Sequence, residues 1–367
     1  MKDHLPALDG LRGIAVLLVL MAHLPVHQGP RWLGWIGLHL QPGYMGVDLF
    51  FVLSGFLITR ILLFDQARGW PLRYFLARRC LRIFPIFYLT VGVMALLRPG
   101  PDLPWVATYL SNFYYAEHGL SGPLAHTWSL SVEEHYYLVW PALVYWLSPR
   151  VARRVALFLL VPAAALCAVW IVREYPLLEA RAMVQVLTPT RMLSLAAGSI
   201  IAWHELRLRA RPGWAALGAL FVGGSGYALV HQSAVRPDFF PWFPALWLVG
   251  FAALSSGLVV LGIVTSGKRN PLALVLSAGP LPVVGKISYG LYLYHLPIFV
   301  GLGVYGMQAK LEPPSLERCA LAVALALGLS AASYRLVERP ILRLQRRFRL
   351  AERAPSKAAS EPTPGPS

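Results

Sequence analysis

The stretch LDGLRGIAVLLVLMAHL, from Leu8 to Leu24, has the composition of a membrane-crossing helix but carries two ionisable residues. Ten apolar or small residues separate Arg12 near its start from His23 near its end. An advance of eleven residues turns a helix about 20° past three full turns and spans ~16 Å along its axis. Both side chains are therefore predicted to share one face. Because ionisable residues inside a membrane span are costly, such a face is usually functional.

The composition of the whole chain supports a membrane protein. Of its 367 residues, 57% are hydrophobic and only 14% are charged, whereas soluble domains are about half apolar and about a quarter charged. The formal net charge is +16, but the arginines cluster in short gaps between apolar runs. This distribution is typical of a protein oriented in a lipid bilayer rather than of a nucleic-acid partner. The three cysteines lie far apart in no metal or redox motif.

The apolar runs predict an all-α polytopic fold with ten transmembrane helices. With the N-terminus in the cytoplasm, 25 of the 33 Lys and Arg residues fall inside and 8 outside, which predicts that both termini are cytoplasmic. The opening run lacks a good signal-peptide cleavage site, so we expect it to be a retained helix. The predicted spans are approximately 8–27, 44–64, 83–98, 134–148, 153–172, 190–204, 213–230, 243–265, 285–306 and 317–337.

The domain organisation is simple. Residues 1–345 are predicted to form one transmembrane domain, and residues 346–367 a basic and then Pro/Ser/Ala-rich disordered cytoplasmic tail. The largest external gap, from about 99 to 133, is rich in Trp and Tyr, as expected at a membrane interface.

The second predicted span, GVDLFFVLSGFLIT, contains two features of interest. The small pair Ser54-Gly55 favours close helix packing. Asp48, near the outer end, is a candidate partner for His23 or for Arg31, and the sequence does not choose between them.

The stretch RYFLARRCLRIFPIFYL places Arg79 and Arg82 three residues apart on a helix entering the membrane. Such a pair can bind a phosphate through charge-assisted hydrogen bonds. By itself, however, the pattern favours ordinary anchoring by positive charge on the cytoplasmic side.

Three further stretches carry ionisable residues. In HTWSLSVEEHYYLVWP, Glu133 and Glu134 lie beside His126 and His135, where a carboxylate can position a hydroxyl or deprotonate it, or hold one histidine tautomer. No tight ligand spacing such as HExxH occurs, so we predict no metal. In GKISYGLYLYHLPIF, His295 lies among tyrosines, which favours aromatic packing. In SYRLVERPILRL, the residues Arg335, Glu338 and Arg339 are spaced for a structural ion pair within one helix.

These six stretches, in this order, resemble the acyltransferase-3 family of integral membrane O-acyltransferases. Arg12 and His23 match the family's arginine, ten residues and histidine. Residues 50–55 match FFxxSG, Arg79 and Arg82 match RxxR, and residues 128–133 match WSLxxE. Two departures stand out. The family commonly has Glu-Gln-Phe-Tyr where this chain has Glu134-His135-Tyr136-Tyr137, and we expect no esterase-like domain after the membrane core.

The resemblance implies a ten-helix core in a bacterial cytoplasmic (inner) membrane. It implies transfer of an acyl group, usually acetyl, from cytoplasmic acyl-CoA to a sugar hydroxyl of lipopolysaccharide, exopolysaccharide, peptidoglycan or a glycosylated natural product. Acetyl-CoA is then the expected donor substrate. The bilayer and a glycan are the expected partners, and the membrane core acts alone or with a separate envelope acetyltransfer partner.

The motifs and the residues together predict a site with two ends. Arg79, Arg82 and Arg12 would hold the CoA phosphates, and the CoA arm would lead to His23. Imidazole titrates near neutrality, so His23 is the expected general base, with transient acylation of His23 as a variant. Glu133 would orient the base or the acceptor. A competing hypothesis is a proton-coupled transporter or exporter. The supporting residues that we expect are Asp9, Asp48, Ser54, Trp128 and His295.

Overall fold

The computed structural model describes residues 5–25, 42–204, 243–266, 271–306, 309, 311–312 and 314–343, and every regular element in these ranges is a helix. This confirms the all-α prediction for the described part of the chain. The predicted span 213–230, Arg31 and the predicted tail 346–367 lie outside the described residues.

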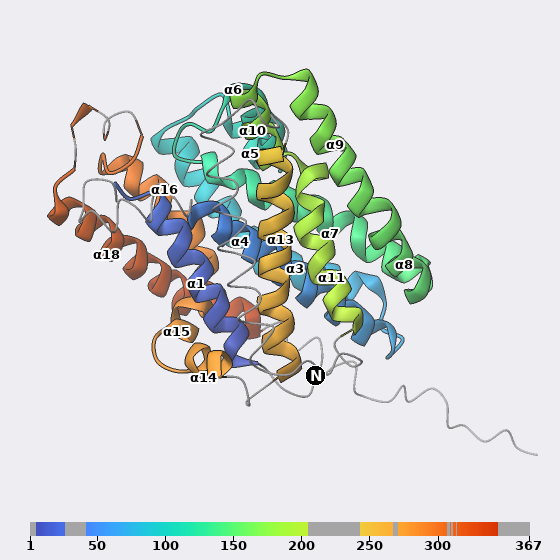
Figure 1. Ribbon diagram of the computed structural model, residues 1–367. Helices are drawn as coiled ribbons and strands as arrows, with labels where there is room; N and C mark the ends of the chain where they lie inside the picture. The colour runs from blue at the N-terminus through green and yellow to red at the C-terminus, as the bar shows by residue number, and fades with distance from the viewer. Residues whose placement is uncertain are drawn as a thin grey trace, which may run out of the picture.

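The described helices fall into long and short elements (Figure 1). The long ones are α1 (Pro6–Ala22), α3 (Pro42–Gln66), α4 (Leu72–Leu97), α7 (Trp128–Trp146), α9 (Val161–Glu174), α11 (Thr188–His204), α13 (Phe243–Ser266), α16 (Ser288–Gly301) and α18 (Leu316–Ser333). The short ones are α5 (Leu103–Ala107), α6 (Ser111–His118), η2 (Ala125–Thr127), α8 (Pro149–Val155), η3 (Ala156–Leu160), α10 (Leu177–Val186), α14 (Pro271–Ser277), α15 (Leu281–Lys286) and η6 (Tyr334–Glu338).

Helices therefore occupy nine of the ten predicted spans, and the tenth, 213–230, lies outside the described residues. Four continuous helical stretches are long and apolar enough to cross a membrane: Met45–Gln66, Leu72–Leu97, Arg150–Ile171 and Leu316–Arg343. The second of these begins earlier than predicted, at Leu72 directly after Pro71. Hydropathy alone placed the start after the arginines, but arginine is a good helix former, so the basic segment continues the helix.

Helix α1 packs inside the bundle, in contact with α3, α14, α15 and α16. Two glycines permit close approach between α1 and α15. A Cβ atom at Gly13 would lie 2.4 Å from the carbonyl oxygen of Leu281, and one at Gly285 would lie 1.8 Å from that of Asp9. Both distances are far below contact, so only glycine fits, and the backbones of α1 and α15 touch directly.

Helices α3 and α11 cross in the same way. A Cβ at Gly55 would lie 2.0 Å from the Leu195 carbonyl oxygen, and one at Gly198 would lie 2.0 Å from that of Val52. The close packing predicted at Ser54-Gly55 is thus confirmed at the glycine.

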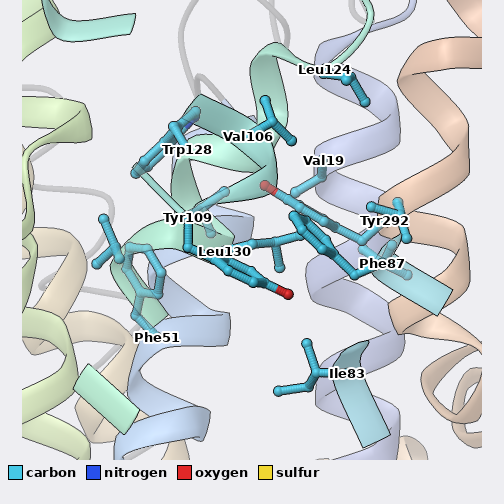
Figure 2. Close-up of a cluster of buried hydrophobic side chains, with 14 of the residues drawn as sticks. Val19, Phe51, Ile83, Phe87, Val106, Tyr109, Leu124, Trp128, Leu130 and Tyr292 are labelled. Carbon is cyan, nitrogen blue, oxygen red and sulfur yellow. The ribbon is translucent and has the colours of Figure 1, made fainter. Parts of the chain in front are cut away.

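The apolar core lies where α1, α3, α4, α7 and α16 meet. Figure 2 shows Val19, Phe51, Phe87, Trp128 and Tyr292 converging from these five helices. Large apolar side chains also point outward from the bundle, for example Leu96 on α4, Leu166 on α9 and Leu336 on η6. An apolar exterior of this kind suits a lipid environment, because lipid tails cover it without cost.

Short helices gather at the two ends of the bundle (Figure 1). The elements α5 and α6 lie at the end where α1 finishes, whereas α14 and α15 lie at the end where α1 begins. The two ends of α1 consequently face different surroundings.

Candidate active site

His23 directly follows the last residue of α1, and its ring orientation is set by its own helix. The ring Nδ1 lies 2.8 Å from the Val19 carbonyl oxygen. A carbonyl only accepts hydrogen bonds, so Nδ1 carries the proton and Nε2 of the neutral ring keeps a lone pair. This tautomer is the one a general base needs.

Two more imidazoles lie next to His23. The His295 ring centroid is 5.0 Å from that of His23, and the His126 ring centroid is 5.1 Å from that of His295. Backbone carbonyls again set the tautomers, because His295 Nδ1 donates to Tyr292 (2.7 Å) and His126 Nε2 donates to Leu293 (3.1 Å). The other ring nitrogen of these two histidines, Nε2 of His295 and Nδ1 of His126, is buried and has no hydrogen-bond partner within the described part of the chain.

We call His23, His126 and His295 the histidine group. The sequence pointed to His23 by its spacing from Arg12, and named His295 only as support. The sequence contained no indication that His126, which lies in the predicted external gap, is close to His23 and His295. The three come from different parts of the chain and meet through the packing of α16 and η2.

A cavity of about 990 Å³ opens beside His23. Its walls come from the C-terminal ends of α1 and α16 and from the segments 98–103 and 120–124. Tyr305 lies edge-on to the His23 ring at a centroid distance of 4.9 Å. The candidate base therefore borders a space large enough for a small molecule.

Cationic residues gather toward the other end of α1. The charges that act on the Arg12 guanidinium include those of Arg82, Asp9 and Glu133, and those that act on Arg79 include Arg82 and Glu133. The structure thus brings Arg12 of α1, Arg79 and Arg82 of α4, and Glu133 of α7 together. The Arg79 guanidinium also lies 5.3 Å from the centre of the Tyr137 ring. We call Arg12, Arg79 and Arg82 the arginine group.

Glu133 belongs to the arginine group's surroundings rather than to the histidine group. Its carboxylate lies near the hydroxyls of Ser54 and Tyr137 and in the field of Arg12 and Arg79. The two hydroxyls are also 2.6 Å apart. Ser54 is therefore a polar contact of the site as well as a neighbour of the packing glycine.

Glu338 corrects a prediction. The expected ion pair with Arg335 and Arg339 does not form among the described residues, because both arginines are exposed while Glu338 is buried. Its carboxylate instead faces Arg82 and Arg12. The π-helical turn of η6 changes the residue spacing, so a count of 3.6 residues per turn misplaced this side chain.

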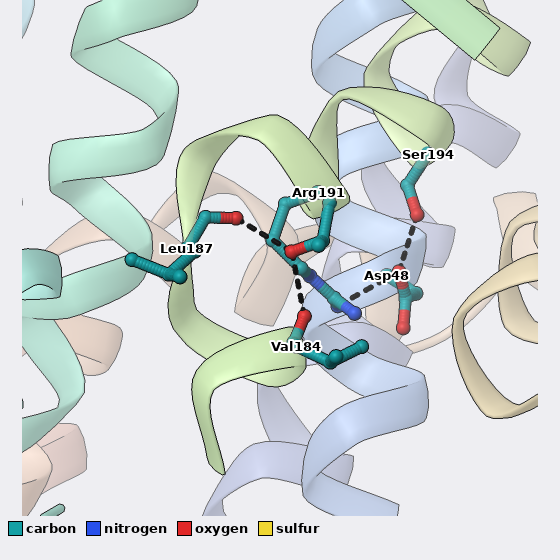
Figure 3. A network of polar contacts seen from close by, with 6 residues as sticks. Asp48, Val184, Leu187, Arg191 and Ser194 are labelled. Carbon is teal, nitrogen blue, oxygen red and sulfur yellow. Dashed lines mark hydrogen bonds and ion pairs between the residues drawn. The ribbon is translucent and has the colours of Figure 1, made fainter. Parts of the chain in front are cut away.

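The contacts of Asp48 also differ from the prediction. Among the described residues its ion-pair partner is Arg191 and not His23, while Arg31 lies outside the described residues; Oδ1 lies 2.8 Å from Arg191 Nη2 and accepts a hydrogen bond from Ser194 at 2.5 Å (Figure 3). Arg191, expected in an external gap, is 1% exposed. The close crossing of α3 and α11 decides this pairing. Trp128, named as a site residue, packs 5.8 Å from the same guanidinium.

The arrangement of these side chains can bind phosphate and accept a proton. Clustered guanidiniums bind phosphate through charge-assisted hydrogen bonds, and a neutral imidazole with a free lone pair accepts a proton. Helix α1 links both features, at the ~16 Å expected for eleven helical residues. Among the described residues, no three His, Cys, Asp or Glu side chains are grouped so as to hold a metal ion.

These features define a helical membrane protein with an ionisable interior. Residues 5–334 match the family model described as the acyltransferase domain, and the chain therefore belongs to the acyltransferase-3 family. The match extends from α1 to the start of η6 and so includes both groups of site residues.

Curated relatives carry the same region. The chain is 29% identical over 365 residues to the peptidoglycan O-acetyltransferase OatA of Listeria monocytogenes, covering 93% of this chain and 56% of the relative. It is 29% identical over 362 residues to the O-acetyltransferase OatA of Staphylococcus aureus, covering 92% of this chain and 57% of the relative. The chain thus spans little more than half the length of these relatives. No solved structure matches it.

Proposed function

We propose that the protein is a membrane-bound O-acyltransferase that moves an acyl group, acetyl in the first instance, from cytoplasmic acyl-CoA to a hydroxyl of a cell-envelope glycan. Family membership supports acyl transfer, and the names of both relatives support acetyl as the group. The name of the Listeria relative supports peptidoglycan as the acceptor. We place the protein in a bacterial cytoplasmic membrane, with ten spans and both termini inside.

The observation that carries this proposal is His23, held as the Nδ1–H tautomer beside the cavity. Its Nε2 removes the proton from the acceptor hydroxyl as the hydroxyl oxygen attacks the thioester carbonyl. The carbon–sulfur bond then breaks, and the imidazolium returns its proton to the departing thiolate. One ester forms, one thioester is lost, and His23 is regenerated.

The donor is proposed to enter from the opposite end. Arg12, Arg79 and Arg82 bind the CoA phosphates, while Glu133 and Glu338 hold these guanidiniums in place. This assigns Glu133 to the donor end, because its contacts lie there and not at His23.

The direct test of the base is transfer by the purified protein in proteoliposomes, with radiolabelled acetyl-CoA and a soluble peptidoglycan fragment. His23→Ala and His23→Gln should each lower kcat by a factor of 10² or more, the usual contribution of general acid–base catalysis. Binding of acetyl-CoA should persist. His118→Ala removes an exposed histidine of α6 and serves as the matched control.

Transfer by His23→Ala at the wild-type rate would exclude the catalytic assignment. Wild-type protein that moves protons across the vesicle membrane and transfers no label would favour the transporter hypothesis instead. Mass spectrometry of protein quenched during turnover distinguishes His23 as a general base from His23 as a transient acyl carrier. Only an acyl carrier retains an acetyl group on the ring.

The donor end is tested by Arg82→Gln. This change removes the positive charge that acts on Arg12, Arg79 and Glu338. The apparent KM for acetyl-CoA should rise about tenfold or more, as expected for loss of a charge-assisted hydrogen bond, with little change in the acceptor KM. The outward-facing Arg339→Gln is the matched control. Loss of membrane insertion in place of a KM effect would indicate simple anchoring.

A further inference from the structure

The cavity beside His23 contains polar groups that the transfer chemistry does not use. Its volume, about 990 Å³, lies at the upper end of the range for small-molecule sites, about 300–1,000 Å³. Its walls include Asp102 and Arg98 as well as Tyr305. Neither the arginine group nor the donor route requires these three side chains.

Asp102 is held in a defined orientation. The fully buried Tyr115 hydroxyl donates a hydrogen bond to its Oδ2 at 2.6 Å. Burial, and then the neighbouring carboxylate, raise the pKa of Tyr115, so the phenol keeps its proton and donates. Oδ1 lies beside Gly100, where a Cβ would be only 2.5 Å away. Any side chain at position 100 would crowd this oxygen, and glycine leaves it accessible as an acceptor.

Arg98 provides the opposite charge at the same cavity. It is the residue that follows α4, its side chain is exposed, and no carboxylate forms an ion pair with it in the part of the chain described here. An unpaired guanidinium at the wall of a cavity is available for a carboxylate or phosphate of a ligand. Tyr305, next to His23, adds an aromatic surface.

We propose that this cavity is the acceptor subsite, and that it selects a sugar bearing an anionic group. Asp102 accepts hydrogen bonds from sugar hydroxyls, Arg98 binds the anion, and Tyr305 packs against the sugar beside His23. This inference rests on the proposed function, because it assigns the acceptor to the cavity at which His23 acts. It adds a class of acceptor and the residues that recognise it.

The test compares three soluble acceptors in the proteoliposome assay: a peptidoglycan disaccharide with a free carboxylate, its neutral methyl ester, and a disaccharide phosphate. Arg98→Gln should raise the KM for the anionic acceptors about tenfold and leave the KM for the ester and for acetyl-CoA unchanged. Asp102→Asn should raise the KM for all three acceptors. The anion with the lower wild-type KM identifies the natural source of charge.

Exposed residues outside the cavity provide the matched controls, namely Arg173→Gln and Glu117→Gln, which should behave as wild type. Retained acetyl-CoA binding shows that each variant is folded. A second measurement needs no turnover: the carboxylate disaccharide should slow maleimide labelling of a Ser121→Cys variant, because Ser121 is exposed and lines the cavity.

The outcomes are distinguishable. Wild-type transfer with an unchanged KM in Arg98→Gln, or an equal KM increase for the ester, overturns the anionic subsite and leaves the proposed function standing. Labelling of Ser121→Cys that the disaccharide does not slow overturns the location of the subsite. Absence of transfer by the wild-type protein to any glycan overturns the proposed function, and this inference with it.

Discussion

Asp48 and Arg191 neutralise each other inside the bundle, at an Nη2–Oδ1 distance of 2.8 Å. The guanidinium lies 5.3 Å from the Phe51 ring centre and 5.8 Å from that of Trp128, so aromatic surfaces surround the pair. Among the described residues, His126 and His295 each have a buried ring nitrogen without a hydrogen-bond partner. A buried charge pair of this kind ties α3 to α11, whereas a ring nitrogen without a partner in the histidine group is available for chemistry.

We expect Asp48→Asn to destabilise the protein by about 3–5 kcal/mol, because it leaves the Arg191 cation buried without its anion. Thermal unfolding in detergent should show a clearly lower midpoint. The double variant Asp48→Asn with Arg191→Met removes both charges and should recover at least half of the loss. A double variant that is less stable than Asp48→Asn alone would contradict this account of the pair.

At the scale of elements, glycine contacts determine which helices touch. Gly55 and Gly198 bring α3 against α11, and Gly13 and Gly285 bring α1 against α15. Small residues at such crossings allow backbones to approach closely, which is a main source of helix association in membranes. The crossing of α3 and α11 is also what places Asp48 against Arg191.

Gly55→Ala should therefore destabilise the protein by about 1–3 kcal/mol, as overpacking does, since the added methyl group would lie 2.0 Å from the Leu195 carbonyl oxygen. The matched control is Gly92→Ala in α4, where a Cβ would meet nothing within 4 Å. That change should be neutral or stabilising by up to about 1 kcal/mol, because alanine favours helix. Equal midpoints of thermal unfolding for both variants would refute the packing argument.

At the scale of the whole molecule, the arginine group and the histidine group lie toward opposite ends of α1. The segments lining the cavity beside His23 come from the predicted external gap, whereas the basic residues that precede Arg79 come from a predicted cytoplasmic gap. Donor and acceptor would then approach from opposite sides of the membrane and meet at His23.

This orientation predicts which residues an impermeant maleimide reaches in intact cells. In a background without the three native cysteines, Ser121→Cys should be labelled from outside, and Arg68→Cys only after the membrane is permeabilised. Both residues are exposed in the structure, so access depends on the side of the membrane. Labelling of Arg68→Cys in intact cells would reverse the topology and the proposed donor route.

The sequence predicted the local features of this protein well. Apolar run length and helical periodicity depend on neighbouring residues, so the all-helical fold of the described residues and the presence of helices in nine of the predicted ranges followed from them. The spacing of Arg12 and His23 predicted a shared helix face in the same way. The residue pattern alone favoured anchoring for Arg79 and Arg82, and the resemblance to the family added the expectation of a phosphate-binding arginine group and of His23 as the base.

The sequence by itself therefore determined the helices, their lipid-compatible surfaces and the types of group in the site. Only the tertiary structure decided the partners: Arg191 for Asp48, Arg82 for Glu338, and His126 and His295 as neighbours of His23. Partners come from distant segments, and their meeting depends on how helices cross and where a π-turn rotates a side chain. Glycine contacts and backbone irregularities control that geometry, and neither has a periodic signature along the chain.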